Sequence, residues 1–391
     1  MNYKKYYQRF LAAHPNTQHY ACHSHHYWPD VTRDAMLQYW DDTAALVDDK
    51  WDMMFGQKVP RVQQLIADVL NIKQPQQLVF APNTHELLFR LLSCFDWSAG
   101  FKVLTTDSEF HSFSRQINRL MEDPRVQVVK VPTEPFATFP QRFVDAATAL
   151  QPDLIFFSQV FFNSGLAVAD LNGLVTQLEH QCQATIAIDG YHGFMALPTD
   201  LCALEGRVFY LAGAYKYAQG GEGCCFMLVP PGNAFRPVYT GWFAEFGALA
   251  GVKSQQVGYA TDGYQFAGAT MDLTALYRLQ AVLELFAADG LTVSAIHQHV
   301  QQLQQTFLQV LDALQHPWLN RAHLLAEDLA AHGHFFTFRG PDAASVVAEL
   351  SALLKQNRIE TDYRGDRLRF GFALYHQVAD INLSCLTQAQ S

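Results

Sequence analysis

The segment ATIAIDGYHG, residues 184–193, decides the fold class of this chain. Its first half, residues 184–188, is an uninterrupted apolar run, and the polar side chains of Asp189 and His192 follow it directly. A continuous apolar run means that both faces of a strand are covered, whereas a half-exposed strand alternates apolar and polar residues. The segment therefore predicts a buried strand of a parallel sheet, with reactive side chains at its carboxyl end.

Six further apolar runs have the same character and alternate with amphipathic helical patterns. They cover residues 78–81, 102–106, 126–131, 154–160, 208–212 and 224–229. Between the first two runs, residues 87–95 place leucines on one helical face, and Asn83 and Thr84 are candidates for the N-cap. We therefore expect an α/β fold whose large domain holds a mainly parallel seven-stranded sheet covered by helices.

The C-terminal part follows a different pattern. Long helical patterns at 271–288 and 293–314 lead to strand-like runs at 334–339, 358–363 and 367–372 around a helix at 343–356. We expect a small α+β C-terminal domain over residues 291–391, a large domain over 51–290, and an N-terminal segment, 1–50, that contributes to the active site and to the small domain.

Composition excludes several classes of protein. The 391 residues are 49% hydrophobic and carry a net charge of -10 without a Lys/Arg-rich run, which disfavours nucleic acid and anionic membranes as partners. No stretch approaches the roughly 20 apolar residues of a membrane helix, and the start lacks a signal-peptide core. Seven cysteines without paired spacing are typical of reduced thiols. We expect a cytoplasmic enzyme.

Lys216 is the lysine with the clearest chemical context. It lies in LAGAYKYAQGGEG, residues 211–223, after a predicted buried strand and before a glycine-rich turn. A partly desolvated lysine loses its proton more easily and can form a Schiff base with an aldehyde cofactor; alternatively, a strand-end lysine extends to water. Asp189 and His192 are expected at the same sheet edge. There Asp189 could contact a pyridine nitrogen and His192 a ring oxygen. Alternatively, Asp189 could serve as a turn or helix cap and His192 as a structural histidine.

Two other motifs bear on the site. FAPNTHEL, residues 80–87, presents backbone N–H groups and a hydroxyl at a helix start, an arrangement that binds phosphate, although capping alone would explain it. CHSHH, residues 22–26, gathers one cysteine and three histidines. Alternating histidines on an extended segment point to opposite faces, so we predict no metal site here.

Together these motifs resemble fold type I pyridoxal-phosphate enzymes of the class V aminotransferase branch, and kynureninase most of all. LRFGFALYHQVADI at 368–381, GWF at 241–243 and FAGAT at 266–270 also resemble kynureninase segments. The resemblance implies a pyridoxal 5'-phosphate-dependent hydrolase that cleaves the Cβ–Cγ bond of kynurenine or a related γ-keto amino acid. The alternatives are an aminotransferase or lyase on another amino acid, with cysteine desulfurase ranked lower because Cys385 lacks a glycine-rich loop, or a non-catalytic binding module.

The resemblance also implies roles for individual residues, in a homodimer with shared active sites. Lys216, Asp189 and Arg369 would be catalytic, with Arg369 gripping the substrate's α-carboxylate. The cofactor-binding set would be Asn83, Thr84, Phe110, Asp189, His192, Tyr215, Lys216 and, from the neighbouring subunit, Thr270. The substrate-binding set would be His23, Ser24, His25, Trp242 and Arg369. The chain departs from kynureninases in the CHSHH segment, at Phe113 and at Ala373, and these departures concern the substrate.

Overall fold

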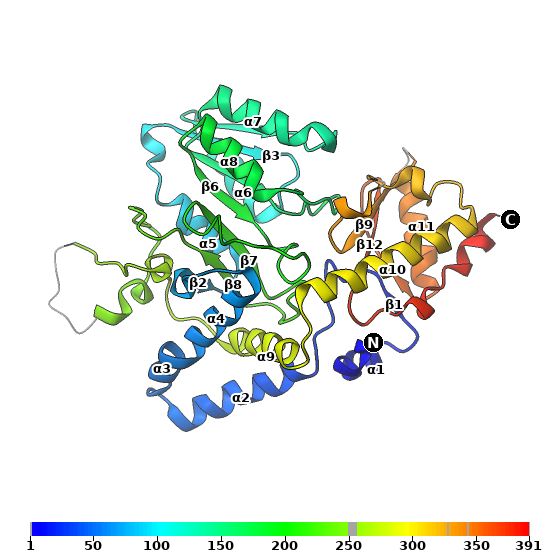
Figure 1. Ribbon diagram of the computed structural model, residues 1–391, viewed down its shortest axis with the longest axis horizontal. Helices are drawn as coiled ribbons and strands as arrows, with labels where there is room; N and C mark the ends of the chain where they lie inside the picture. The colour runs from blue at the N-terminus through cyan, green and yellow to red at the C-terminus, as the bar shows by residue number, and fades with distance from the viewer. Residues whose placement is uncertain (1, 249–255, 327, 342–343, 391) are drawn as a thin grey trace.

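A seven-stranded sheet forms the centre of the larger part of the molecule (Figure 1). The computed structural model describes residues 2–248, 256–326, 328–341 and 344–390. In the sheet order β2-β8-β7-β6-β5-β3-β4, β8 runs antiparallel to both neighbours and the other described strands are parallel. The mainly parallel α/β fold is therefore confirmed. The strands are β2 (Leu78–Ala81), β3 (Phe101–Thr106), β4 (Val126–Val131), β5 (Leu154–Ser158), β6 (Thr185–Asp189), β7 (Val208–Gly213) and β8 (Cys225–Leu228).

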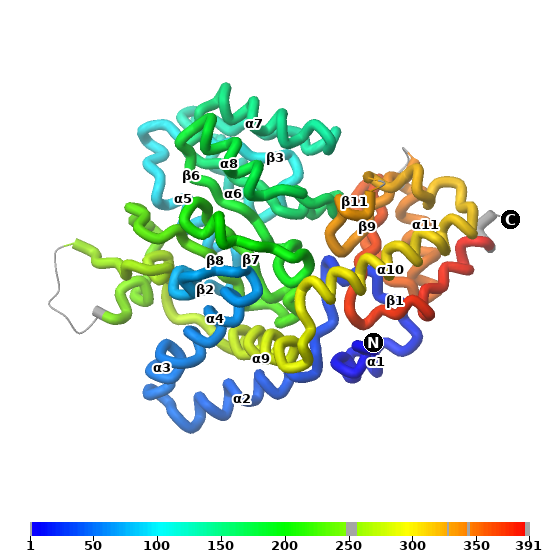
Figure 2. Tube along the Cα trace, in the orientation of Figure 1, coloured from blue at the N-terminus to red at the C-terminus, as the bar shows by residue number. Residues whose placement is uncertain are grey.

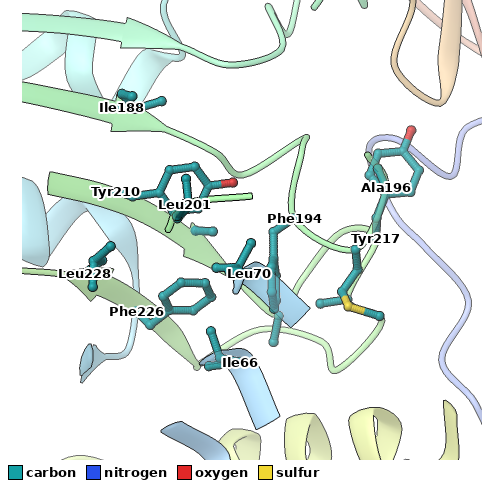
Figure 3. Close-up of a cluster of buried hydrophobic side chains, with 14 of the residues drawn as sticks. Ile66, Leu70, Ile188, Phe194, Ala196, Leu201, Tyr210, Tyr217, Phe226 and Leu228 are labelled. Carbon is teal, nitrogen blue, oxygen red and sulfur yellow. The ribbon is translucent and has the colours of Figure 1, made fainter. Parts of the chain in front are cut away.

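Helices cover both faces of this sheet, which explains why its central strands β5, β6, β7 and β8 are mostly apolar. One face packs against α4 (Val59–Leu70), α7 (Phe139–Leu150), α8 (Leu171–Gln181) and α9 (Thr274–Ala288). The other face packs against α5 (Thr84–Leu92) and α6 (His111–Leu120). Figure 3 shows the first layer, in which Ile66 and Leu70 of α4 approach Phe226 and Leu228 of β8. The remaining N-terminal helices are α1 (Gln8–Ala13), α2 (Val31–Leu46) and α3 (Lys50–Met53).

A second, smaller core lies in the C-terminal part of the chain. There an antiparallel sheet in the order β11-β12-β9 packs against α10 (Val293–Leu314) and α11 (Ala344–Gln356). Its strands are β9 (Phe335–Arg339), β11 (Asp362–Arg364) and β12 (Arg367–Gly371). The expected start of α11 at Ala343 lies outside the described residues.

The N-terminal segment lies against this C-terminal part, as the tube in Figure 2 shows. Strand β1 (Gln18–His19) pairs in parallel with β10 (Ile359–Glu360). Our prediction of a single strand over 358–363 is therefore wrong. The chain pairs first with β1 and then, from Asp362 onward, with β12, so that one predicted strand is divided between two sheets.

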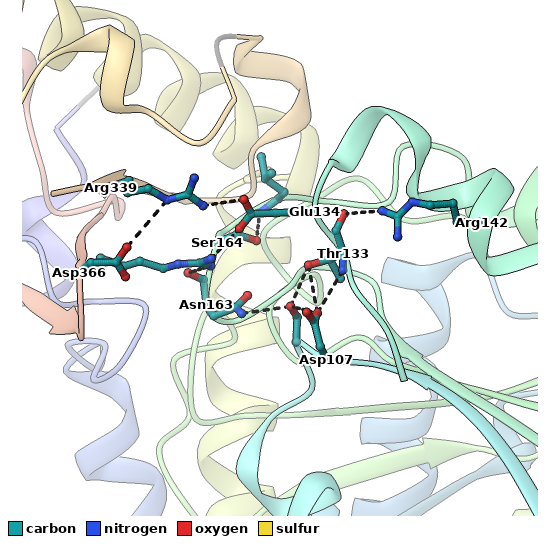
Figure 4. Close-up of polar contacts among 11 residues, drawn as sticks. Asp107, Thr133, Glu134, Arg142, Asn163, Ser164, Arg339 and Asp366 are labelled. Carbon is teal, nitrogen blue, oxygen red and sulfur yellow. Dashed lines mark hydrogen bonds and ion pairs between the residues drawn. The ribbon is translucent and has the colours of Figure 1, made fainter. Parts of the chain in front are cut away.

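Ion pairs connect the small sheet to the large one (Figure 4). Glu134, in the loop after β4, accepts hydrogen bonds from Arg339 of β9 and Arg367 of β12, each at 2.5 Å. Arg339 also lies 3.9 Å from Asp366, in the turn between β11 and β12. Because Glu134 is shared by two cations from two strands, it ties the small sheet to the carboxyl-terminal edge of the large one.

Local polar residues explain the differences between predicted and observed boundaries. Helix α5 begins at Thr84 rather than at residue 87, because the Asn83 side chain caps the first turn by accepting a hydrogen bond from Glu86 N at 2.9 Å. Helix α9 begins at Thr274 rather than 271, after Asp272 accepts the Thr274 N–H at 2.8 Å. In the described residues no single helix is long and apolar enough to span a membrane, and α9 and α10 pass that test only as a pair bent by 85°.

Candidate active site

A cavity of about 240 Å³ opens at the carboxyl-terminal edge of the large sheet. The strand ends of β5 and β6, the turn after β7 and the starts of α5 and α6 all contribute to its wall. Seven of the predicted cofactor-binding residues line it together: Asn83, Thr84, Phe110, Asp189, His192, Tyr215 and Lys216.

The amine of Lys216 points into this cavity from the turn after β7. Its Nζ lies 2.5 Å from His192 Nε2 and 5.3 Å from the centroid of the Phe110 ring. Burial lowers the pKa of Lys216 to about 7, even though the negative charge of Asp189 opposes the shift. Near neutral pH a large fraction of this amine is therefore uncharged and able to act as a base or nucleophile.

His192 is neutral beside this amine. Burial, the charge of Lys216 and the neighbouring His23 hold the pKa of His192 well below its usual value. A neutral imidazole nitrogen can accept a hydrogen bond from the lysine ammonium or donate one to the free amine, depending on its tautomer. His192 can therefore accept a hydrogen bond from the Lys216 ammonium and relay its proton, but with a lowered pKa it does not hold that proton near neutral pH.

Asp189 and Phe110 define two other sides of the cavity. Asp189 ends β6, and its carboxylate accepts the Tyr191 N–H at 2.9 Å. Burial raises the pKa of this carboxyl, while the Tyr191 N–H and the charge of Lys216 counteract that effect. Phe110 directly precedes α6 and leaves 38% of its surface exposed, which is enough ring area for stacking on a planar ligand.

Glu109 explains how Phe110 and the end of β5 are held together. It is 3% exposed and accepts hydrogen bonds from Thr106 Oγ1 at 2.6 Å and from Ser158 Oγ at 2.5 Å. Burial raises the pKa of Glu109 to about 8. Sequence reasoning missed this residue, because a single glutamate after a strand carries no pattern that marks it as buried.

A second cluster adjoins the cavity and contains the predicted substrate-binding residues His23, Ser24 and Arg369. Arg369 Nη1 donates a hydrogen bond to the backbone oxygen of Phe162 at 2.6 Å, and its Nη2 donates to the Asp362 carboxylate. Ser24 Oγ donates to the same carboxylate at 2.7 Å. His23 is 1% exposed and stacks on Phe335 with ring centroids 4.7 Å apart. Asp362 therefore joins three predicted residues, although sequence reasoning gave it no role.

The histidines of residues 22–26 face different neighbours. His25 Nδ1 is hydrogen-bonded to the Tyr215 hydroxyl, whereas His26 Nδ1 contacts the Tyr27 backbone oxygen at 2.7 Å. In the part of the chain that the structure describes, no group of three or more His, Cys, Asp or Glu side chains is placed to hold a metal ion.

Trp242 and Thr270 lie outside this cavity. They contact each other through a 3.2 Å hydrogen bond from Trp242 Nε1 to Thr270 Oγ1. Trp242 packs on Trp51 and Phe243, and neither Trp242 nor Thr270 is among the residues that line the cavity. The role of Trp242 in lining the substrate pocket of its own protomer is therefore not supported by its position.

The fold and the cavity define an enzyme of the pyridoxal-phosphate fold type I class. The family model for class V aminotransferases matches residues 27–361, and the chain belongs to this family. Its cofactor is pyridoxal 5'-phosphate.

Solved structures of similar fold include enzymes that act on sulfur amino acids. The complex between the cystine C–S lyase C-DES and its reaction product cysteine persulfide matches with a TM-score of 0.80 and 19% identity, over 96% of this chain and 99% of that chain. The cysteine desulfurase CsdA from Escherichia coli matches with a TM-score of 0.76 and 17% identity, over 98% and 97% of the two chains. At these identities the likeness establishes the fold alone.

A cysteine desulfurase from Enterobacter sp. (strain 638) is 22% identical over 243 residues, or 61% of this chain. The chain spans 58% of the length of this curated relative in the match.

The residues present fit the cofactor. The start of α5 offers the Thr84 hydroxyl and backbone N–H groups to a phosphate, and Phe110 offers a ring face for stacking. Asp189 can supply an anion for a protonated ring nitrogen, and Lys216 supplies an amine for the aldehyde. These groups surround one cavity of suitable chemistry, with an amine that is already partly deprotonated.

The prediction of a kynureninase-like hydrolase is wrong, as is the ranking of cysteine desulfurase below it. The relatives reported above are cysteine desulfurases and a cystine C–S lyase. The structure supplies a physical reason at one position of the supposed kynurenine pocket. Phe113, where kynureninases carry an aspartate, is 3% exposed and stacks on Phe156 in the core, with ring centroids 3.8 Å apart.

Proposed function

We propose that this protein is a pyridoxal-phosphate-dependent lyase that cleaves the carbon–sulfur bond of cysteine or its disulfide, cystine. The observation that carries the proposal is the Lys216 amine, with a pKa of about 7, facing Asp189 and Phe110 in one cavity of a class V enzyme. The similarity to a cysteine desulfurase and to a cystine C–S lyase supports this substrate class.

The chain's own residues handle the proton of the reaction. Pyridoxal phosphate, when bound, supplies a ring that takes up the electron pair left on the substrate's α-carbon. Lys216 Nζ, uncharged in a large fraction of molecules near pH 7, accepts the α-proton, and His192 Nε2 at 2.5 Å can exchange a proton with it. The Asp189 carboxyl lies in the cavity wall, where its ionised form would favour a protonated ring nitrogen.

Two outcomes are open to such an enzyme. A desulfurase transfers sulfur to one of its own cysteines and releases alanine, whereas elimination from cystine consumes one water and yields pyruvate, ammonia and cysteine persulfide. The second reaction needs no protein thiol, because the sulfur leaves on the other half of the substrate.

The burial of the cysteines favours elimination. This holds even for Cys225, which lines the Lys216 cavity but is 2% exposed and contacts the Tyr191 hydroxyl at 3.4 Å. All seven lie in the described residues, five of them buried, with Cys94 and Cys202 half-buried. A reactive cysteine has a lowered pKa and an accessible sulfur. Here burial raises the thiol pKa, to about 12 for Cys94 and Cys225, and upward as well for Cys22, Cys182, Cys224 and Cys385. Cys202 lies ahead of β7, at the opposite edge of the sheet from Lys216.

Product analysis tests the proposal. Cofactor-loaded protein is incubated separately with L-cystine and L-cysteine, and pyruvate, ammonia and alanine are quantified, with Lys216→Ala as the control. Equimolar pyruvate and ammonia from cystine, absent in the control, would support elimination. Alanine from cysteine as the main product would support the desulfurase instead, and no product from either substrate would refute carbon–sulfur cleavage.

The homodimer with shared sites remains a proposal. It is supported by the position of Trp242 and Thr270, which lie together outside the cavity of their own protomer and are both exposed enough to contact a second chain. Analytical ultracentrifugation of the cofactor-loaded protein tests it, since a single monomeric species at micromolar concentration would contradict a shared site.

A further inference from the structure

Asp362 is placed opposite Arg369 by the register of the small sheet. The two residues are direct partners on β11 and β12, and their side chains form an ion pair. Ser24 adds a second contact through its 2.7 Å hydrogen bond to the Asp362 carboxylate. The Asp362 carboxylate is therefore held in place by hydrogen bonds from both ends of the chain.

The accessible part of this ion pair is the anion. The side chain of Asp362 is 20% exposed, whereas that of Arg369 is 3% exposed. A ligand that reaches the pair from outside has more carboxylate than guanidinium surface to contact. Burial alone would raise the pKa of Asp362, but His23, Arg369 and Ser24 hold that pKa below its usual range, so the group is an anion at neutral pH.

Unpartnered polar atoms surround the same carboxylate. His23 is 1% exposed, and neither of its ring nitrogens has a hydrogen-bond partner among the described residues; the Nε atom of Arg369 is in the same state. His23 Nε2 lies 3.6 Å from the Asp362 carboxylate, too far for a hydrogen bond. Buried polar atoms without partners cost free energy. The acceptor nitrogen of neutral His23 can take a hydrogen bond from a ligand N–H, whereas Arg369 Nε is a donor that only a ligand acceptor could pair.

The cluster lies beside the Lys216 cavity and contacts residues that line it. Arg369 donates its hydrogen bond to the backbone oxygen of Phe162, and His192 Nε2 lies 3.4 Å from the backbone oxygen of His23. Phe162 and His192 both line the cavity. A substrate whose amine is at Lys216 can therefore extend its far end toward Asp362.

We propose that Asp362 is a specificity-determining residue that binds an ammonium group on the leaving half of the substrate. This inference rests on the proposed carbon–sulfur lyase function and names its substrate class. The class consists of disulfides whose leaving half carries an amino group. Cystine is the simplest amino acid of this class. The leaving half of cystine brings an ammonium to an accessible anion, whereas the sulfur that leaves cysteine itself carries no cation for Asp362 to bind.

Two mixed disulfides of cysteine isolate the charge on the leaving half. Cysteine linked to cysteamine carries an ammonium there, and cysteine linked to 3-mercaptopropionate carries a carboxylate on a chain of similar length. Pyruvate formation gives kcat/KM for each. We expect the wild-type enzyme to prefer the cysteamine disulfide by at least about tenfold, the range of one charged hydrogen bond.

Variants locate the source of this preference. Asp362→Asn should bring the ratio of the two kcat/KM values close to one, and Asp362→Glu, which keeps the charge, should retain part of it. Asp366→Asn is the matched control, because Asp366 lies in the adjacent turn and its ion pair in the described part of the chain is with Arg339, at 3.9 Å. It should leave the ratio unchanged.

Three results would overturn the proposal. The first is equal kcat/KM values for the two disulfides in the wild type, and the second is a ratio that Asp362→Asn does not change. The third is a rise in kcat/KM for both substrates in Asp362→Asn, which would mean that Asp362 competes with the substrate for Arg369. Titration of the cofactor absorbance with both disulfides measures binding without turnover. A binding preference that depends on Asp362, without any pyruvate, would refute the lyase function while supporting the ammonium site.

Discussion

The cofactor side of the cavity is built from the ends of neighbouring strands, whereas the substrate side joins residues from opposite ends of the chain. Asp189 ends β6 and Lys216 follows β7, and these strands pair in parallel, so that the proximity of the two residues is a consequence of the sheet. Ser24 and Asp362 are 338 positions apart and meet only because β1 pairs with β10 in the small unit.

This difference separates two kinds of control over the reaction. The strand ends hold the groups that every substrate of a pyridoxal-phosphate enzyme requires, while Asp362 is the residue proposed to contact the part that varies between substrates. Changes on the cofactor side should therefore abolish turnover of all substrates, and changes on the substrate side should alter which substrate is preferred.

The largest effect is expected at Lys216. Lys216→Ala removes both the covalent anchor and the base, and we expect pyruvate formation from cystine to fall by at least about 1,000-fold. Lys130→Ala, at an exposed lysine on β4, is the control and should keep full activity. Substantial turnover by Lys216→Ala would assign the base to another residue.

A smaller loss is expected at Asp189. Asp189→Asn keeps the shape of the side chain and removes its charge, and the loss of a charged hydrogen bond of about 3 kcal/mol corresponds to roughly 100-fold in kcat. The loss should be the same for all disulfide substrates. Asp145→Asn, at an exposed aspartate of α7, serves as the control, and an unchanged kcat in Asp189→Asn would rule out the assigned role.

The pH dependence of cofactor capture tests the lowered pKa of Lys216. Because only the neutral amine attacks an aldehyde, the capture rate of cofactor-free protein should rise about tenfold per pH unit below pH 7 and level off above it. Stopped-flow absorbance measures this rate. Nα-acetyllysine, whose amine has the usual pKa, is the reference and should keep rising to about pH 10; a protein profile with that same high midpoint would contradict the burial of Lys216.

The smallest effect is expected at Ser24. Ser24→Ala removes one hydrogen bond to Asp362, which we expect to cost about 1.5 kcal/mol and to raise KM for cystine roughly tenfold with kcat unchanged. Steady-state kinetics separate the two constants. Ser98→Ala, which removes a hydroxyl bonded to the exposed Asp96, is the control. A fall in kcat without a change in KM would place Ser24 in the chemical step.

The sequence predicts the cofactor side well because each of its residues lies next to an element with its own local signal. The apolar run before Asp189 and the Asn83 cap of α5 are both visible in a few residues. The substrate side has no such signal, since Asp362 begins β11, a strand of only three residues, and its partner Ser24 is distant in sequence. The resemblance to kynureninase assigned Trp242 to the substrate side instead, and the structure places Trp242 outside the cavity of its own protomer.

The most direct test of the central claim is whether sulfur leaves on the substrate rather than on a protein cysteine. Cofactor-loaded enzyme is treated with iodoacetamide under native conditions, and pyruvate and alanine formation from L-cystine and L-cysteine are compared before and after treatment. We predict that pyruvate formation from cystine survives alkylation, because the cysteines are buried or half-buried and take no part in elimination. Alanine as the main product, with turnover lost on alkylation, would contradict the account and identify a desulfurase that uses its own thiol.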